Sequence, residues 1–211
     1  VQIKDKYADA RRTEIREEEA TEFSREDLIP HQKVIVTLTA GGFIKRLPAS
    51  TYRVQHRGGR GVMGMVTREG DSVQHVLSAD THDSILFFTG RGRVYSVKCY
   101  QLPEESSRTA KGTAIVNVIP VELKDEITAL LAVPRFSTGQ FMVMASRKGV
   151  VKKTPLEQFA SIRRSGVIAI NLRSEDHLVS AQVAGDKDEI VLVSKNGLAN
   201  RFQVEELRTA S

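Results

Sequence analysis

The sequence of 211 residues contains no tryptophan and only one cysteine, Cys99. A single cysteine cannot form an internal disulfide, so we expect a reducing compartment, the cytoplasm. Cys99 lies in a strand-like stretch, residues 97–100, which favours a packing role for its thiol over a nucleophilic one. The sequence also lacks any apolar run long enough for a membrane-spanning helix, so none is predicted.

Common catalytic patterns are missing as well. The five histidines are scattered along the chain, no HExxH motif is present, and one cysteine cannot make a Cys pair. Walker A and G-x-S-x-G motifs, which mark phosphate-binding loops and serine nucleophiles, are absent. We therefore expect no catalytic residue, no metal and no cofactor in this chain.

Charge is distributed unevenly along the chain, whose formal net charge is +5. Residues 1–27 hold 6 of the 31 basic and 9 of the 26 acidic side chains, so residues 28–211 are clearly basic. A basic domain attracts polyanions, and nucleic acid is the commonest polyanion in the cytoplasm. On charge alone, a basic surface without a partner is an equally good interpretation.

Residues 1–27 have the character of a helix followed by a linker. Val1, Ala8 and Ile15 recur at heptad spacing, and glycine and proline are absent from this segment. The pattern has no capping residue at its start. We therefore predict that this segment is the end of a longer helix in a larger protein.

From residue 28 onward, β-branched and aromatic residues become frequent and a pattern repeats. Each copy has an apolar strand, a glycine turn and a second strand, at 34–47, 85–95, 141–153 and 190–202. The turns hold Gly42, Gly92, Gly149 and Gly197. A second glycine follows the first three hairpins, at Gly61, Gly112 and Gly166, and precedes another short predicted strand, at 62–66, 113–118 and 167–172. A further strand follows Asp71, Asp125 and Asp176, where a turn or cap is the expected role of the carboxylate.

A unit of four short strands and about 50 residues matches a propeller blade. We therefore predict an all-β, propeller-like array with blades at about 28–70, 71–124, 125–175 and 176–211, the last one incomplete. The lack of tryptophan excludes the WD40 and kelch patterns. Three and a half blades cannot close a ring, so the domain is expected to continue beyond Ser211.

Basic residues recur in these units. If the blades stack around an axis, such residues form a curved band of positive charge, which can engage the phosphates of a bent duplex. Ordinary solvated side chains at hairpin tips are the alternative interpretation. The predicted DNA-binding residues of the hairpins are Lys45, Arg46, Arg91, Arg93, Lys152, Lys153 and Arg201, and those of the connecting loops include Lys111, Arg163 and Arg164.

The loop at residues 55–61 combines three glycines with two arginines. Glycine lets the backbone approach another surface closely, and arginine offers a planar set of donors that suits phosphate. This composition predicts an anion-binding turn at the end of the first unit. Its predicted DNA-binding residues are Gln55, Arg57, Gly58, Gly59, Arg60 and Gly61.

Residues 55–61, Gln-His-Arg-Gly-Gly-Arg-Gly, resemble the box that marks the C-terminal domain of the DNA gyrase A protein, usually Gln-Arg-Arg-Gly-Gly-Lys-Gly. His56 replaces an arginine and loses a permanent cation, whereas Arg60 replaces a lysine and keeps the charge. Residues 7–15 are similar to the end of the family's breakage-reunion domain. Residues 26–30 and 36–39 are similar to its entry into the first blade, so the resemblance runs from Tyr7 to the end.

The resemblance implies a β-pinwheel, in which neighbouring blades exchange strands, and sequence-nonspecific wrapping of duplex DNA that requires the box. It also implies the partners of the holoenzyme: the rest of the gyrase A protein and the gyrase B protein in an A2B2 assembly, with ATP and Mg bound elsewhere. The wrap would support ATP-dependent negative supercoiling. The family's cleavage tyrosine follows an arginine and none of the tyrosines here does, so this fragment is not expected to cut DNA.

Two other functions stay open. The related domain of topoisomerase IV bends DNA with less wrapping and has a degenerate or absent box, so the near-intact box argues against it. A propeller scaffold for protein partners is the second alternative. Such a scaffold would not bind DNA with a steep dependence on salt.

Overall fold

The computed structural model describes residues 2–7, 26–52, 64–67, 69–122 and 125–210. These residues form one short α-helix, α1 (Gln2–Tyr7), and antiparallel strand pairs. The strands are β1 (Lys33–Thr39), β2 (Phe43–Pro48), β3 (Val73–Asp80), β4 (Ser84–Thr89), β5 (Arg93–Lys98), β6 (Thr113–Ala114), β7 (Ile127–Val133), β8 (Gln140–Ser146), β9 (Val151–Pro155), β10 (Val167–Ile168), β11 (Leu178–Gly185), β12 (Glu189–Val193) and β13 (Ala199–Gln203). No helix in this part of the chain is long and apolar enough to cross a membrane.

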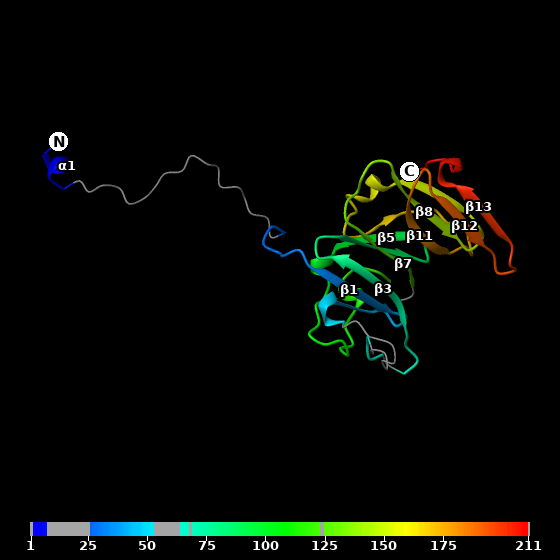
Figure 1. The fold of residues 1–211 in the computed structure, drawn as a ribbon, viewed down its shortest axis with the longest axis horizontal. Coiled ribbons are helices and arrows are strands. Elements are labelled where there is room, and N and C mark those ends of the chain that lie inside the picture. The colour runs from blue at the N-terminus through cyan, green and yellow to red at the C-terminus, as the bar shows by residue number, and fades with distance from the viewer. Residues whose placement is uncertain (1, 8–25, 53–63, 68, 123–124, 211) are drawn as a thin grey trace.

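The strands form successive sheets that follow one another in chain order (Figure 1). Their strand orders are β3-β1-β2-β6, β10-β5-β4-β7, β11-β8-β9 and β12-β13. The predicted all-β, propeller-like array is therefore confirmed. The predicted N-terminal helix is described only over α1, and its remainder, like the loop at 55–61, lies outside the described residues.

The sheets do not coincide with the predicted blade ranges. β3 pairs with β1, with Ala79 opposite Val34, and β6 pairs with β2, with Ala114 opposite Phe43. Both strands belong to the predicted second blade, yet both complete the first sheet. The repeat period reveals how often a strand recurs, but it cannot reveal which neighbour the strand joins.

The fourth strands are shorter than predicted. Of the expected strand at 113–118, only β6 is extended, and Ile115–Asn117 form a 3₁₀ turn. Of the expected strand at 167–172, only β10 is extended. The expected strand at 62–66 lies partly outside the described residues, and its described end, 64–66, is not a strand.

The apolar faces of successive sheets pack against each other. In β4, Ile85 and Phe87 contribute to the core shared with the first sheet, whereas Leu86 and Phe88 contribute to the core shared with the third. All of β4 is buried, because alternate side chains point to opposite faces of a sheet that is covered on both sides. This stacking is how blades that bury little alone form a stable array.

The repeated aspartates cap the hairpin turns, as the sequence predicted. Asp71 Oδ1 accepts a hydrogen bond of 2.7 Å from the backbone N–H of Gly41, in the β1–β2 turn. Asp125 Oδ1 accepts from the N–H of Arg91, and Asp176 Oδ1 from that of Lys148, in the next two turns. Each carboxylate therefore fastens the hairpin turn of the preceding unit to the start of the next strand.

The free energy of unfolding should depend on pH through these capping carboxylates, as Asp176 illustrates. Burial alone would raise the pKa of Asp176, but hydrogen bonds from Ser146 Oγ and from the N–H groups of Lys148 and His177 lower the pKa below its ordinary value. A lowered pKa in the folded state stabilises the fold above the ordinary carboxyl pKa of about 4, and this stabilisation is lost as pH falls through the folded pKa. We therefore expect Asp176→Asn to unfold at lower urea at neutral pH, with the difference from the wild type shrinking in acid. Urea midpoints between neutral pH and acid measure this, and a difference that is constant with pH would contradict it.

Candidate nucleic-acid interface

The turn glycines align the four hairpins and show which basic residues are equivalent. Lys45 and Lys152 occupy the same position in their strands, three residues after the turn glycine, and Arg46, Lys153 and Arg201 occupy the next one. At the Lys45 position, the second hairpin has Tyr95 and the fourth has Asn200. The cations are therefore repeated in only some of the units.

Lys45 does not face solvent. Its side chain is fully buried, and its ammonium donates hydrogen bonds to the carbonyl oxygens of Gly64 (3.0 Å), Ala110 (2.9 Å) and Arg108. Burial lowers the pKa of Lys45, and the nearby Glu105 opposes that shift. Lys45 is therefore used inside the fold to hold the loop at 106–112, and in this conformation its ammonium is not exposed to a phosphate.

Arg46 and Lys153, two further predicted DNA-binding residues, are also buried in this structure. Arg46 forms an ion pair of 2.8 Å with Glu104 and donates to the carbonyl of Leu102. Lys153 pairs with Asp186 and donates to the carbonyl of Val204 at 3.1 Å. Burial and internal acceptors turn both cations away from the surface where a phosphate would bind.

Arg93 and Lys152 are half-buried and also bind backbone carbonyls. The Arg93 guanidinium donates to the carbonyl of Ser165 at 2.9 Å, and the Lys152 ammonium donates to that of Ala169 at 3.0 Å. Arg93 thereby holds the loop that carries Arg163 and Arg164, as Lys45 holds the preceding loop. The hairpin cations thus position the connecting loops.

The connecting loops present their own cations to the outside. Arg163 and Arg164 are exposed, and Lys111 is half-buried with its ammonium 4.2 Å from the centre of the Phe43 ring. Arg91 and Arg201 are exposed as well, but each has an acidic neighbour: Arg91 lies 2.7 Å from Glu122 and Arg201 lies 3.4 Å from Glu189. The free positive charge of the predicted set therefore lies mainly on the loops.

The loop at 106–112, Ser-Ser-Arg-Thr-Ala-Lys-Gly, is a degenerate copy of the loop at 55–61. When Gly112 is aligned with Gly61, Arg108 matches Arg57 and Lys111 matches Arg60. Gly112 has φ +80°, and a Cβ atom there would lie 2.5 Å from the carbonyl oxygen of Ile44. The second glycine is therefore required where the loop crosses the preceding hairpin, a contact that the sequence did not reveal.

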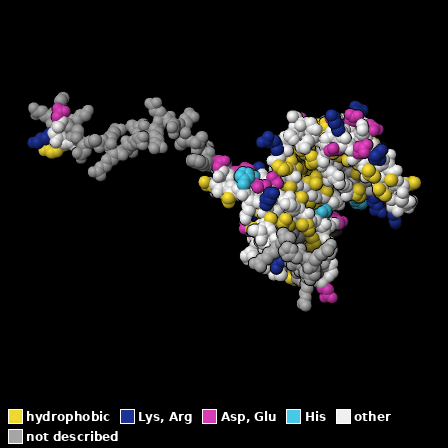
Figure 2. Space-filling model, in the orientation of Figure 1, with side chains coloured by type: hydrophobic (Ala, Val, Ile, Leu, Met, Phe, Trp, Pro, Cys, Tyr) yellow, Lys and Arg dark blue, Asp and Glu magenta, His cyan; other side chains and the backbone are white. Residues whose placement is uncertain are grey.

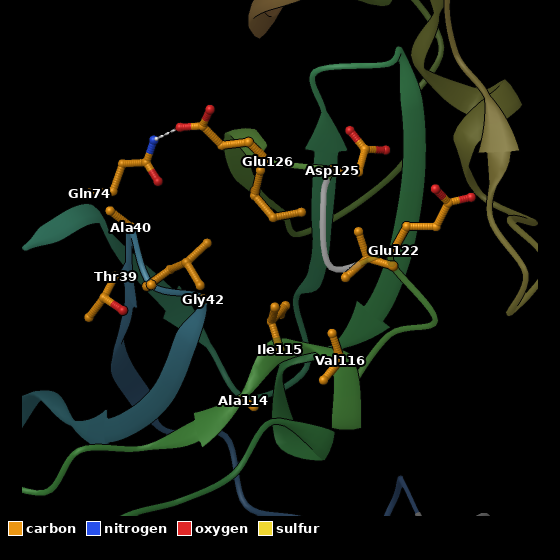
Figure 3. Close-up of a pocket in the computed structure, with 14 residues that line it drawn as sticks. Thr39, Ala40, Gly42, Gln74, Ala114, Ile115, Val116, Glu122, Asp125 and Glu126 are labelled. Carbon is orange, nitrogen blue, oxygen red and sulfur yellow. Dashed lines mark hydrogen bonds between the residues drawn. The ribbon is translucent and has the colours of Figure 1, made fainter. Parts of the chain in front are cut away.

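The cavity between the first and second sheets is unsuited to DNA. It has a volume of about 450 Å³ and is lined by the β1–β2 turn and by Glu122, Asp125 and Glu126. Figure 3 shows these carboxylates around it, with Gln74 hydrogen-bonded to Glu126 at 3.0 Å. Acidic side chains repel phosphate, so the cationic loops remain the candidate interface.

Lysine and arginine form no continuous patch among the described residues on the face seen in Figure 2. They are separated there by hydrophobic and acidic side chains.

The single thiol, that of Cys99, lies inside the fold. Cys99 is fully buried, and burial raises its pKa to about 11, so its thiol is protonated at neutral pH. The predicted packing role of Cys99 is confirmed.

Fold and repeats together define a β-propeller domain of the pinwheel type, built from strand-exchanging blades. The family model for the DNA gyrase C-terminal domain, described as a beta-propeller, matches residues 33–80, 83–134, 140–184 and 188–211. The chain belongs to this family. The first matched segment ends with β3 and the second ends just after β7. Each therefore includes the strand that the predicted blade ranges had assigned to the following blade.

The chain is similar to several proteins named as the A subunit of DNA gyrase. It is 47% identical over 209 residues to that of Dehalogenimonas lykanthroporepellens, an alignment that covers 99% of this chain and 26% of the relative. It is 44% identical over 207 residues to that of Clostridium acetobutylicum, covering 98% of this chain and 25% of the relative. The chain therefore spans about a quarter of the length of these curated relatives.

Solved structures show the same fold. The C-terminal domain of a DNA topoisomerase IV superposes with a TM-score of 0.70 at 27% identity, over 86% of this chain and 55% of that one. A DNA gyrase A C-terminal domain superposes with a TM-score of 0.69 at 24% identity, over 85% of this chain and 57% of that one. The architecture is common to both kinds of domain.

Proposed function

We propose that this chain binds duplex DNA without sequence preference and wraps it, as the C-terminal part of a gyrase A protein. The observation that carries the proposal is that the loops before Gly112 and Gly166 cross the preceding hairpins and bear cations, half-buried in the first loop and exposed at Arg163 and Arg164 in the second. Loops that recur in consecutive sheets offer phosphate contacts at successive places along one duplex. Family membership supports the same conclusion.

The energetics favour wrapping by phosphate contacts over reading of bases. Bending 20–30 base pairs by 40–90° costs roughly 1–6 kcal/mol, and several phosphate contacts are needed to offset that cost. Arg163, Arg164 and Lys111 lie on loops held by hairpin cations, so little side-chain or backbone order has to be created on binding. No element of the described chain has the length of a recognition helix for the major groove.

The wider role follows from the relatives, and it is part of the proposal. The wrapped DNA would serve ATP-dependent negative supercoiling by an A2B2 assembly of gyrase proteins in the cytoplasm. Cleavage and ATP hydrolysis, with their Mg, would be supplied by other parts of that assembly. This chain would contribute DNA binding and no catalytic residue.

A topoisomerase IV-type bending domain is the second candidate, because the superpositions on the two kinds of domain are equally close. The box at 55–61 differs from the usual gyrase form at two positions and keeps all of its glycines and two of its cations. A near-intact box favours wrapping over simple bending. A protein scaffold has no comparable observation in its favour.

The salt dependence of DNA binding tests the proposed interface. Each phosphate contact contributes about 0.9 to the slope of log K against log salt concentration. We expect Arg163→Gln with Arg164→Gln to lower that slope by up to about 1.8 while leaving sequence preference unchanged. The exposed pair Arg173→Gln with Lys187→Gln removes the same charge elsewhere and should change the slope less. Fluorescence anisotropy with two unrelated duplexes measures both slopes, and equal slopes for the two double variants would refute this interface.

A further inference from the structure

Three side chains, two of them close together in the sequence and one about 50 residues before them, meet where the chain enters the first sheet. His31 lies just before β1, Asp80 ends β3, and His82 lies in the turn before β4. His31 Nδ1 is 2.8 Å and His82 Nδ1 is 3.5 Å from Asp80 Oδ1, and the two imidazole rings are stacked with centroids 3.8 Å apart. One nitrogen or oxygen atom of each residue lies within 4.8 Å of the others.

The hydrogen bonds of His82 indicate that, in its neutral form, the lone pair of Nδ1 points into this cluster. His82 Nε2 lies 3.1 Å from the carbonyl oxygen of Glu26, which can only accept, so Nε2 carries the proton of the neutral ring. Thr81 Oγ1 is 3.2 Å from Nδ1, but the nearest acceptor for its single proton is the carbonyl of Pro30 at 2.8 Å, closer than Asp80 Oδ1 at 3.4 Å. In the neutral ring, Nδ1 therefore faces a carboxylate oxygen with no hydrogen between them, an arrangement that either a proton or a metal ion on Nδ1 would stabilise.

The other two groups are open to an incoming ion. The hydrogen bonds that Asp80 accepts from the described residues all end on Oδ1, including one of 3.0 Å from the N–H of His82, so Oδ2 is available. The His31 side chain is 74% exposed, which gives an ion access from solvent. The bond from His82 Nε2 to a backbone carbonyl is the outer contact that commonly orients a metal-binding histidine.

We propose that His31, Asp80 and His82 form a binding site for a divalent transition-metal ion of the zinc class. Two imidazole nitrogens and one carboxylate, completed by solvent, match the donors that Zn²⁺ takes, whereas Mg²⁺ and Ca²⁺ take oxygen donors. Binding replaces the proton of His31 Nδ1, which is released to solvent.

The site has a structural consequence for the start of the domain. Glu26 forms an ion pair of 2.8 Å with Lys98 at the end of β5, and the Pro30 carbonyl accepts a hydrogen bond from Thr81 in the β3–β4 turn, so this segment already contacts both elements. A metal ion would replace the hydrogen bond between His31 and Asp80 by metal–ligand bonds from His31 to the same turn. It would fix the direction in which the chain before β1 leaves the sheets, independently of the proposed DNA contacts.

The experiment is a titration of the tag-free chain with Zn²⁺, followed by calorimetry and by ¹⁵N NMR of the histidine rings. We expect one equivalent to bind, with Nδ1 shifts at His31 and His82, and no comparable binding of Mg²⁺. His31→Ala and His82→Ala should each weaken binding at least about tenfold, a loss typical even of outer-sphere changes. His177→Ala, at an exposed histidine outside the cluster, is the matched control and should bind as the wild type does.

His31→Ala is the decisive variant because its side chain is exposed and its loss should leave the fold intact. Circular dichroism confirms folding of each variant before titration. The proposal is overturned if the wild type binds no Zn²⁺. It is equally overturned if His31→Ala binds as tightly as the wild type, or if the shifted rings are those of other histidines.

Discussion

Gly112→Ala is expected to lower the free energy of unfolding by about 3 kcal/mol or more, within the range of severe single substitutions. Gly112 has φ +80°, a left-handed conformation that costs a residue with a side chain about 1–2 kcal/mol. The added Cβ would also lie 2.5 Å from the carbonyl oxygen of Ile44, and 3.0 Å from its carbon. Backbone atoms cannot move aside as a flexible side chain can, so β6 would have to separate from β2.

A control variant, Gly139→Ala, separates the cost of the left-handed backbone conformation from the cost of the steric clash of the added Cβ. Gly139 also has φ +80°, but a Cβ there meets nothing within 4 Å, so Gly139→Ala should cost only the conformational part, about 1–2 kcal/mol. Urea unfolding of both variants gives the two free energies. Gly166→Ala should resemble Gly112→Ala, because Gly166 has φ +72° and its Cβ would lie 2.9 Å from the carbonyl oxygen of Val94 as well as 2.6 Å from the Tyr95 ring. Equal losses at Gly112 and Gly139 would show that the loops do not cross the hairpins as closely as described.

Replacing both arginines of the box, Arg57→Ala with Arg60→Ala, is expected to abolish most of the DNA wrap while reducing affinity only moderately. The cations Arg108 and Lys111 occupy the matching places in the next loop, and the exposed Arg163 and Arg164 remain too. Two lost phosphate contacts lower the salt slope by about 1.8, whereas the wrap depends on a continuous path of contacts along the duplex.

Two measurements distinguish the loss of wrapping from the loss of binding. Anisotropy gives the affinity, and the linking number of closed circular DNA gives the wrap. The double variant Arg173→Ala with Lys187→Ala removes the same charge from exposed positions outside the box and should retain the wrap. If the box variant changes the linking number as much as the wild type does, the box is not the element that the family resemblance implies.

The sequence predicted the parts of the fold that depend on local pattern. Turn glycines such as Gly92, with φ +80°, and capping aspartates such as Asp176 are required by the geometry of a single hairpin, so they repeat visibly. Strand exchange depends on which neighbour a strand joins. The pairing of β6 with β2 therefore could not be predicted from the repeat period alone.

Burial explains why the candidate interface was only partly predicted. Lys45 and Arg163 have the same charge in the sequence, but one donates to three carbonyls inside the fold and the other is exposed. Apolar residues beside a lysine or arginine in the sequence do not show whether its side chain is buried or exposed, because the long aliphatic part of these side chains packs against apolar surface in both cases. The cluster of His31, Asp80 and His82 was missed for a related reason, since its members meet only when β3 pairs with β1.

The linking number of circular DNA is the most direct measure of whether this chain wraps a duplex. Nicked plasmid is incubated with the chain, sealed by ligase, freed of protein and analysed as topoisomers on a gel. A wrap of the positive hand implied by the family predicts a rise in linking number that grows with the ratio of protein to DNA. An unchanged topoisomer distribution, at a ratio where the DNA is saturated with protein, would contradict the account.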